Sequence, residues 1–133
     1  MKRLRSTILA LFGVTWFVVT STSFAAVEIP MIENATVSPS PRYPYEARKW
    51  HMTGNGLYLL RVDIETGKVK KVTVAKSTGH DILDREVIFA LERWQFQPGK
   101  LHPIRQLLPN VNDPHRDSDS ILKVPVRFTL GTH

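Results

Sequence analysis

The chain has 133 residues and no cysteine, with 18 lysines and arginines against 12 acidic residues. This length allows one small domain, and the lack of cysteine excludes a disulfide framework and thiol chemistry. Three of the basic residues lie within the first five positions. The rest of the chain therefore has 15 basic and 12 acidic residues. Such a small excess gives no support for nucleic-acid binding.

Residues 1–25 have the three parts of a secretory signal: a basic start, an apolar run and a small-x-small cleavage pattern at Ser23-Phe24-Ala25. We expect cleavage after Ala25 and export from the cytoplasm. The alternative is an uncleaved anchor, because residues 6–26 carry no charge and are long enough to cross a bilayer. Contact with a membrane is expected only if this leader is retained.

Residues 26–40 are predicted to form a short irregular lead-in that contains Pro30 and Pro39. A short helix of two to three turns follows over residues 43–54. Its signals are Pro44, since proline is favoured at the first helical position, and Gly54, which lies where a helix can end.

Residues 57–65 alternate between apolar and other side chains, which predicts a strand with one buried face. The turn sequence Thr66-Gly67-Lys68 then leads into a second alternating run over residues 69–75. Together these segments predict a β-hairpin.

The stretch from Ser77 to Pro98 predicts an amphipathic helix, because its apolar residues recur at helical spacing. Asp81 is the predicted N-cap, and Pro98 forbids continuation beyond Gln97. The apolar stripe consists of Leu83, Val87, Ala90, Leu91 and Trp94.

Residues 101–120 are predicted to form an irregular insertion that is mobile over residues 113–120, because a structureless connection of this length is unusual in a compact domain. The last segment, residues 121–130, alternates most regularly and predicts a final strand. Pro125 removes one donor from its ladder, which favours an edge position for this strand.

The order helix, strand, strand, helix, strand predicts an α+β fold. Two helices should pack on one face of a three-stranded antiparallel sheet with strand order 2-1-3, because short connections that do not break the hairpin place the last strand beside the first. The last strand would then be exposed along one side.

No pattern in the sequence predicts catalysis. The five histidines lack the spacing of metal ligands, and Asp113, Asp117 and Asp119 lack the glycine turn and distal glutamate of a calcium loop. Ser77, His80 and Asp81 are sequence neighbours of the kinds found in turns and caps, whereas a catalytic triad draws its members from separate parts of a fold. We therefore expect no enzyme activity, metal or cofactor.

The order and spacing of several short motifs resemble the TonB C-terminal domain family over residues 38–130. The motifs are Pro41-x-Tyr43-Pro44-x-x-Ala47, Gly54, Gly67-x-Val69-x-x-Val72-x-Val74, Ser77-x-Gly79, Leu83-Asp84, Ala90, Trp94-x-Phe96-x-Pro98 and Val124-Pro125-Val126-x-Phe128-x-Leu130.

This resemblance implies a periplasmic domain over residues 41–133, with an insertion at 101–120, that engages outer-membrane receptors or other envelope proteins in energy-coupled transport. It also implies that the Tyr-Pro motif lies near the partner-binding region and that the last strand accepts a receptor peptide as an added strand. The implied partner-binding residues are Tyr43, Pro44, Lys123, Val124, Pro125, Val126, Arg127, Phe128 and Thr129.

Two alternatives stay open at this point. The chain has only a short spacer before the domain and no histidine in its apolar leader, unlike energised members of the family. A periplasmic adaptor that transmits no energy, anchored or free, is therefore one alternative. A structural envelope protein that forms homodimers through its own edge strand is the other. His51 also stands where the family often has glycine, which is expected to alter the end of the first helix.

Overall fold

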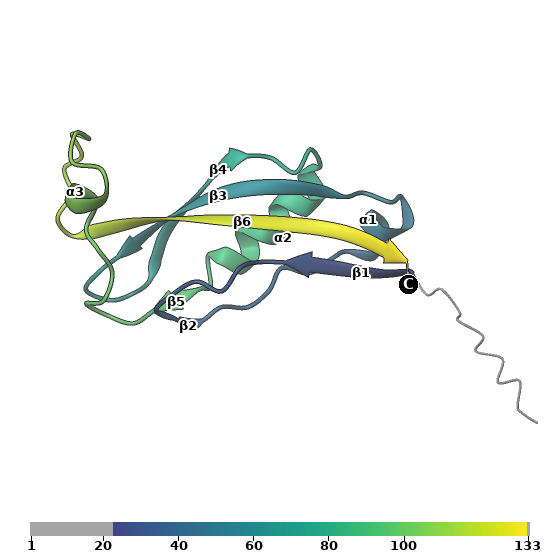
Figure 1. Ribbon diagram of the computed structural model, residues 1–133, viewed down its shortest axis with the longest axis horizontal. Coiled ribbons are helices and arrows are strands. Elements are labelled where there is room, and N and C mark those ends of the chain that lie inside the picture. Colours follow the sequence, from purple (N-terminus) through teal and green to yellow (C-terminus); the bar gives the residue numbers. More distant parts are fainter. Residues whose placement is uncertain (1–22, 133) are drawn as a thin grey trace, which may run out of the picture.

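The computed structural model describes residues 23–132, which form one elongated α+β unit (Figure 1). Nine elements follow one another along these residues: β1 (Ser23–Glu28), β2 (Ala35–Val37), α1 (Tyr45–Lys49), β3 (Gly54–Asp63), β4 (Val69–Lys76), α2 (Asp81–Leu91), β5 (Gln95–Phe96), α3 (Ile104–Leu107) and β6 (Asp119–Thr132).

The main sheet is antiparallel and has the strand order β1-β6-β3-β4. The predicted order 2-1-3 appears within it as β4-β3-β6. The prediction of three strands was wrong, because β1 adds a fourth strand beside β6. A separate two-stranded sheet joins β2 to β5. Residues 26–40 are thus not an irregular lead-in, since they supply part of β1 and all of β2.

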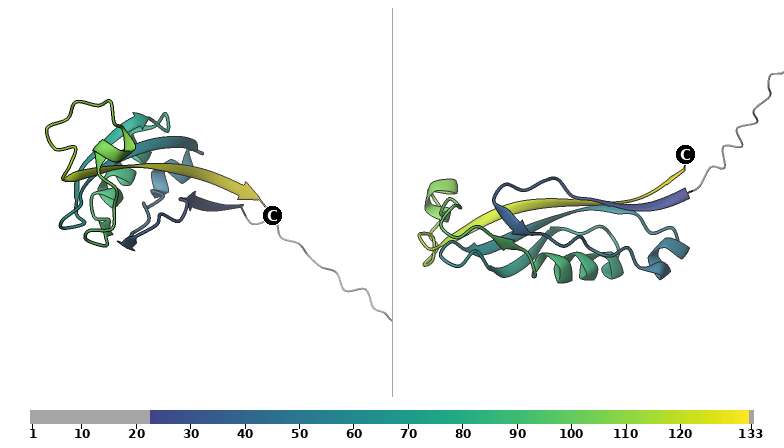
Figure 2. Two further views of the ribbon diagram at one scale, coloured as in Figure 1. Left: turned by 60° about the vertical axis from the view of Figure 1, so that its left-hand side comes forward. Right: turned by 90° about the horizontal axis from the view of Figure 1, so that it is seen from below.

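Helices α1 and α2 lie on the same face of the main sheet, as predicted (Figure 2). The alternation read in the sequence places one face of β3 and one face of β6 against these helices. Burial of this face removes apolar area from water, which stabilises the domain. The core contains Ala47, Tyr58, Leu60, Val62, Leu83, Val87, Leu91, Trp94, Phe96, Leu101, Val124, Val126 and Phe128.

Helix α2 begins one residue earlier than predicted and ends earlier than predicted. His80 has extended backbone angles and occupies the N-cap position, so Asp81 is the first helical residue rather than the cap. At the other end the helix stops at Leu91, well before Gln97. The cause is tertiary, because Phe96 donates its N–H to the carbonyl of Gly67 and β5 pairs with β2.

Helix α1 is a single short turn that ends in a left-handed residue. His51 has φ of 55°, and the N–H groups of His51 and Met52 donate to the carbonyls of Arg48 and Ala47. This pair of bonds is a Schellman motif, whose left-handed position usually holds glycine. The expectation that His51 affects the end of the first helix therefore has a structural basis.

The insertion contains α3 and is bound to the sheet by ion pairs. The guanidinium of Arg61 on β3 contacts the carboxylates of Asp113 and Asp119, and Lys70 on β4 also contacts Asp119. Asp119 is fully buried, so this paired charge is held where an unpaired one would be costly. Asp113, in the segment for which the sequence predicts mobility, thus contacts β3, and Asp119 is the first residue of β6.

The predicted leader lies almost wholly outside the described residues, of which only Ser23, Phe24 and Ala25 belong to it, in β1. Between residues 23 and 132, no helix is both long enough and apolar enough to span a bilayer.

Candidate functional site: the edge of β6

Strand β6 is the longest in the fold, and its outer edge is divided into two halves. Its C-terminal half pairs with β1, in a register that runs from Ser23 opposite Thr132 to Glu28 opposite Arg127. The N-terminal half, residues 121–126, pairs with no strand of the described chain on this side. The last strand is therefore not exposed along its whole side, and the prediction of a fully open edge was wrong.

One hydrogen bond shows which residues of the open half direct their main-chain N–H and C=O groups away from β3. Ile64 donates its N–H to the carbonyl of Ser118 at 3.0 Å, and the register between β3 and β6 is unbroken from there. Successive residues of a strand direct their N–H and C=O groups to opposite sides. The main-chain groups of even-numbered residues of β6 therefore face β3. The main-chain groups of Ile121 and Lys123 consequently face the open side.

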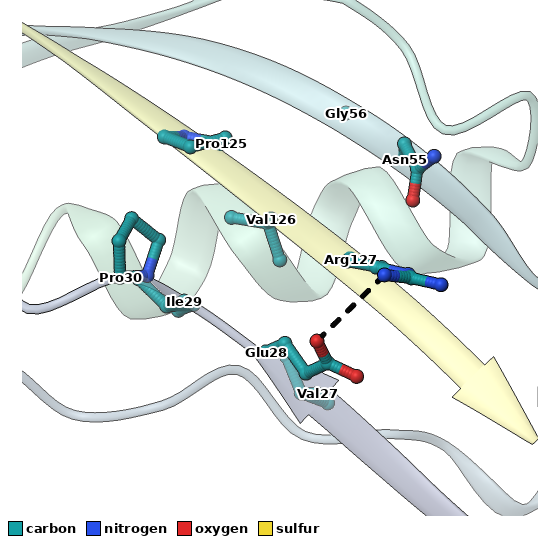
Figure 3. Close-up of a pocket in the computed structure, with 9 residues that line it drawn as sticks. All are labelled: Val27, Glu28, Ile29, Pro30, Asn55, Gly56, Pro125, Val126 and Arg127. Carbon is teal, nitrogen blue, oxygen red and sulfur yellow. Dashed lines mark ion pairs between the residues drawn. The ribbon is translucent and has the colours of Figure 1, made fainter. Parts of the chain in front are cut away.

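Two prolines mark the point where the edge changes from paired to open. The register of β1 with β6, continued by two residues, places Pro30 opposite Pro125. Neither residue has an N–H to donate, so no hydrogen bond forms between them, and the pairing ends at Glu28 and Arg127. In the close-up, Pro30 and Pro125 lie at one end of the paired segment, and Glu28 reaches toward Arg127 further along (Figure 3).

A hollow lies on each side of this boundary. One, of about 640 Å³, is formed by residues 27–30, residues 125–127 and the start of β3 (Figure 3). The other, of about 500 Å³, lies between residues 31–34 and the first residues of β6, with Leu107 of α3 on its rim. The open half of the edge is thus flanked by two places that can receive side chains.

The predicted partner-binding residues of β6 divide by face. Val124, Val126 and Phe128 point into the core and are buried, so their side chains cannot meet a partner. The alternate residues lie on the opposite, solvent-facing side of the strand. Those residues are Lys123, Pro125 and Arg127, which are exposed, and Thr129, which is half-buried.

The Tyr-Pro motif lies close to the same strand. The ring of Tyr43 packs edge-on against Phe128, with 5.1 Å between centroids, and its hydroxyl donates to the carbonyl of Met52. Burial raises the pKa of the Tyr43 hydroxyl, and nearby Arg48 lowers it by a smaller amount. Tyr43 and Pro44 are both half-buried, so the structure brings them beside β6 without fully exposing them.

The opposite edge of the sheet has a different character. Strand β4 carries exposed Lys70, Lys71 and Lys76, and lysines on an edge strand discourage pairing with another chain. The open half of β6 has one exposed lysine, Lys123. Of the two edges, β6 is the more suitable for adding a strand.

The residues suggested by the Ser/His/Asp neighbours form no catalytic arrangement. Ser77, Thr78 and Tyr58 all donate to the carboxylate of Asp84, while His80 occupies the N-cap position of α2. Burial raises the pKa of Asp84, but these hydrogen bonds outweigh it, so the pKa lies below its ordinary value. The cluster fixes the turn from β4 into α2.

Sequence reasoning missed β1, the element that covers half of the edge. A weak signal was present, since Val27 and Ile29 alternate with Glu28 before Pro30. The cleavage pattern that ends at Ala25 hid it, because it assigned the first half of this strand to a leader.

Comparison with known proteins agrees with this architecture. The sequence matches the family described as Gram-negative bacterial TonB protein C-terminal over residues 39–130. The chain belongs to this family. Strands β1 and β2 both lie before the matched residues.

Two curated relatives share part of their sequence with this chain. It is 30% identical over 104 residues to Protein TonB of Vibrio cholerae serotype O1, a match that covers 78% of this chain and 36% of that protein. It is 38% identical over 66 residues to Protein tonB2 of Pseudomonas aeruginosa, which covers 47% of this chain and 23% of the relative. The chain thus spans about a third or less of each relative.

Proposed function

We propose that this chain is an exported, non-enzymatic module of the periplasm that binds outer-membrane transport receptors in energy-coupled transport. A receptor segment would add as a strand to the open half of the β6 edge. The observation that carries this proposal is the row of unpaired main-chain groups at Ile121 and Lys123, beside a sheet whose other edge is protected by lysines.

Main-chain pairing at such an edge gives affinity, and pockets for alternate side chains give selectivity. The two hollows that flank the open half, of about 640 and 500 Å³, fit the second requirement. The exposed side chains of Lys123, Pro125 and Arg127 would lie on the partner-facing surface. Tyr43 and Pro44 would support this surface from below, through Phe128.

The test replaces Lys123 by proline. Its N–H faces the open side, so Lys123→Pro removes a donor available to a partner and leaves the β3 ladder intact. Lys123→Ala is the matched control, because it removes the side chain and keeps the N–H. The purified parent chain and both variants are incubated with solubilised outer membranes, and captured β-barrel receptors are identified by mass spectrometry.

We expect the parent chain and Lys123→Ala to capture receptors and Lys123→Pro to capture at least tenfold less, with unchanged thermal unfolding. Equal capture by all three proteins would contradict addition at this edge. Absence of receptors from every sample would contradict receptor binding itself and favour an adaptor for another envelope protein.

The same open half supports self-association as a second candidate, because an unprotected edge can pair with its own copy. Sedimentation of the parent chain over a hundredfold concentration range separates the two. A dimer that Lys123→Pro abolishes supports the structural alternative, and a monomer throughout rules it out.

A further inference from the structure

We propose that β1 is a built-in competitor for the partner strand: it occupies the C-terminal half of the β6 edge and leaves when a partner strand pairs along the whole edge. This inference rests on the proposed function of that edge. It makes partner binding an exchange of one strand for another rather than a simple addition.

The first support is the position of β1. It pairs with residues 127–132, so it blocks main-chain groups that a partner would need once its strand extends beyond Pro125. Three of the predicted partner-binding residues, Arg127, Phe128 and Thr129, lie in the part that β1 covers. Strand β1 also precedes the family-matched residues 39–130, so it is an addition to the matched domain.

The second support is how little holds residues 25–28 of β1 in place beyond their main-chain bonds. Ala25 and Ala26 present only small side chains, and Val27 is partly buried against the core. No residue between Ala25 and Glu28 is fully buried. Loss of residues 25–28 from the sheet therefore uncovers little apolar surface, in contrast to loss of β3 or β6.

The ion pair of β1 with β6 is equally weak. Glu28 and Arg127 are 4.0 Å apart, and both side chains are more than half exposed. Pairs of this kind contribute little because solvent screens them. The pairing ends at Glu28, and the continued register would place Pro30 opposite Pro125, where neither residue can donate an N–H.

The predicted cleavage site would control how firmly β1 covers the edge. Cleavage after Ala25 removes Ser23, Phe24 and Ala25, so three of the six paired positions would remain. A short three-residue strand holds the edge less firmly than six residues do. Processing of the leader would therefore make the edge more available to a partner.

The test locks β1 to β6 in the full chain. Ala26 and Thr129 are opposite each other in the register. The main-chain groups of odd-numbered residues of β6 face away from β3, so those of Thr129 face Ala26. Cα atoms of such pairs are about 5.5 Å apart, within the range that a disulfide spans. The chain has no other cysteine, so Ala26→Cys with Thr129→Cys forms a unique cross-link.

The probe is a fluorescent synthetic peptide that copies residues 23–30, and its binding is followed by fluorescence anisotropy. We expect the reduced double variant to bind the probe and the oxidised one to bind at least tenfold more weakly. The single variant Ala26→Cys under oxidising conditions serves as control and should bind like the parent chain. Equal binding by oxidised and reduced protein, or no binding by either, would overturn the proposal.

A second pair of variants needs no disulfide. The N–H of Ala26 faces β6 whereas that of Ala25 faces away, so Ala26→Pro should weaken β1 and raise probe affinity several-fold more than Ala25→Pro. The same affinity for both variants would also count against exchange. Because the probe contains no receptor sequence, these results do not depend on the outcome of the receptor capture experiment.

Discussion

Asp84 shows how one buried carboxylate can fix a turn. It is 8% exposed and accepts hydrogen bonds from the hydroxyls of Tyr58, Ser77 and Thr78 and from the N–H of Thr78. No cation is among these partners, so the carboxylate is stabilised by hydrogen bonds alone. Burial raises the pKa of the Tyr58 hydroxyl, and its hydrogen bond to Asp84 raises that pKa further.

We expect Asp84→Asn to lower the free energy of unfolding by about 1–3 kcal/mol, because the amide cannot accept all four bonds and leaves buried donors without partners. Urea denaturation followed by circular dichroism measures the change. Asp81→Asn, at an exposed position of the same helix, is the control and should change stability by about 0.5 kcal/mol or less.

The pH dependence follows from the lowered pKa of Asp84. A carboxylate whose pKa is lower in the folded state stabilises the fold above its ordinary pKa of about 4, and this contribution is lost as the pH falls toward the folded value. Between pH 7 and pH 3, the parent chain should therefore lose more stability than Asp84→Asn. An equal loss would show that Asp84 is not responsible.

His51 stores a small backbone strain at the end of α1. Its φ of 55° is costly for a residue with a Cβ, and glycine adopts it freely. His51→Gly should raise the free energy of unfolding by about 0.5–1 kcal/mol. Lys49→Gly, inside the same helix, should lower it, so opposite signs for the two variants in thermal denaturation would confirm the effect.

At the scale of elements, the insertion depends on its ion pairs with the sheet. Two oxygens of Asp113 meet the guanidinium of Arg61, and these hydrogen bonds lower the pKa of Asp113 to about 2. The pair is thus intact above pH 4 and weakens as the pH falls toward 2. The contact joins the insertion to the central strand of the fold.

Asp113→Asn should loosen α3 without unfolding the domain. Hydrogen exchange of the N–H groups of Arg105 and Leu108 should accelerate at least tenfold, while that of β3 stays unchanged. Asp117→Asn is the matched control, because Asp117 pairs with Arg105 where both side chains are more than 60% exposed. Similar acceleration in both variants would mean that Asp113 has no special role.

At the scale of the whole molecule, β4 and β6 differ in how their outer edges are protected from pairing with another chain. Lysines protect β4 along its length, whereas β1 covers only half of β6 and prolines end that cover. The half-covered edge is therefore the feature from which both the proposed receptor contact and the proposed strand exchange follow.

The sequence alone determined the elements whose signals are local. Alternation gave β3, β4 and β6, and their relative order in the sheet followed from short connections between them. The buried faces of β3 and β6 were also correct, because a period of two leaves little ambiguity about which residues face the helices.

Tertiary structure decided what local patterns cannot express. Helix α2 stops at Leu91 because Phe96 finds a partner at Gly67, and β1 exists because β6 offers it an edge more than ninety residues away in sequence. The sequence determined that Pro125 cannot donate toward a neighbouring strand. Only the folded chain decided which half of that edge its own β1 occupies, because strand pairing depends on which main-chain groups meet in space.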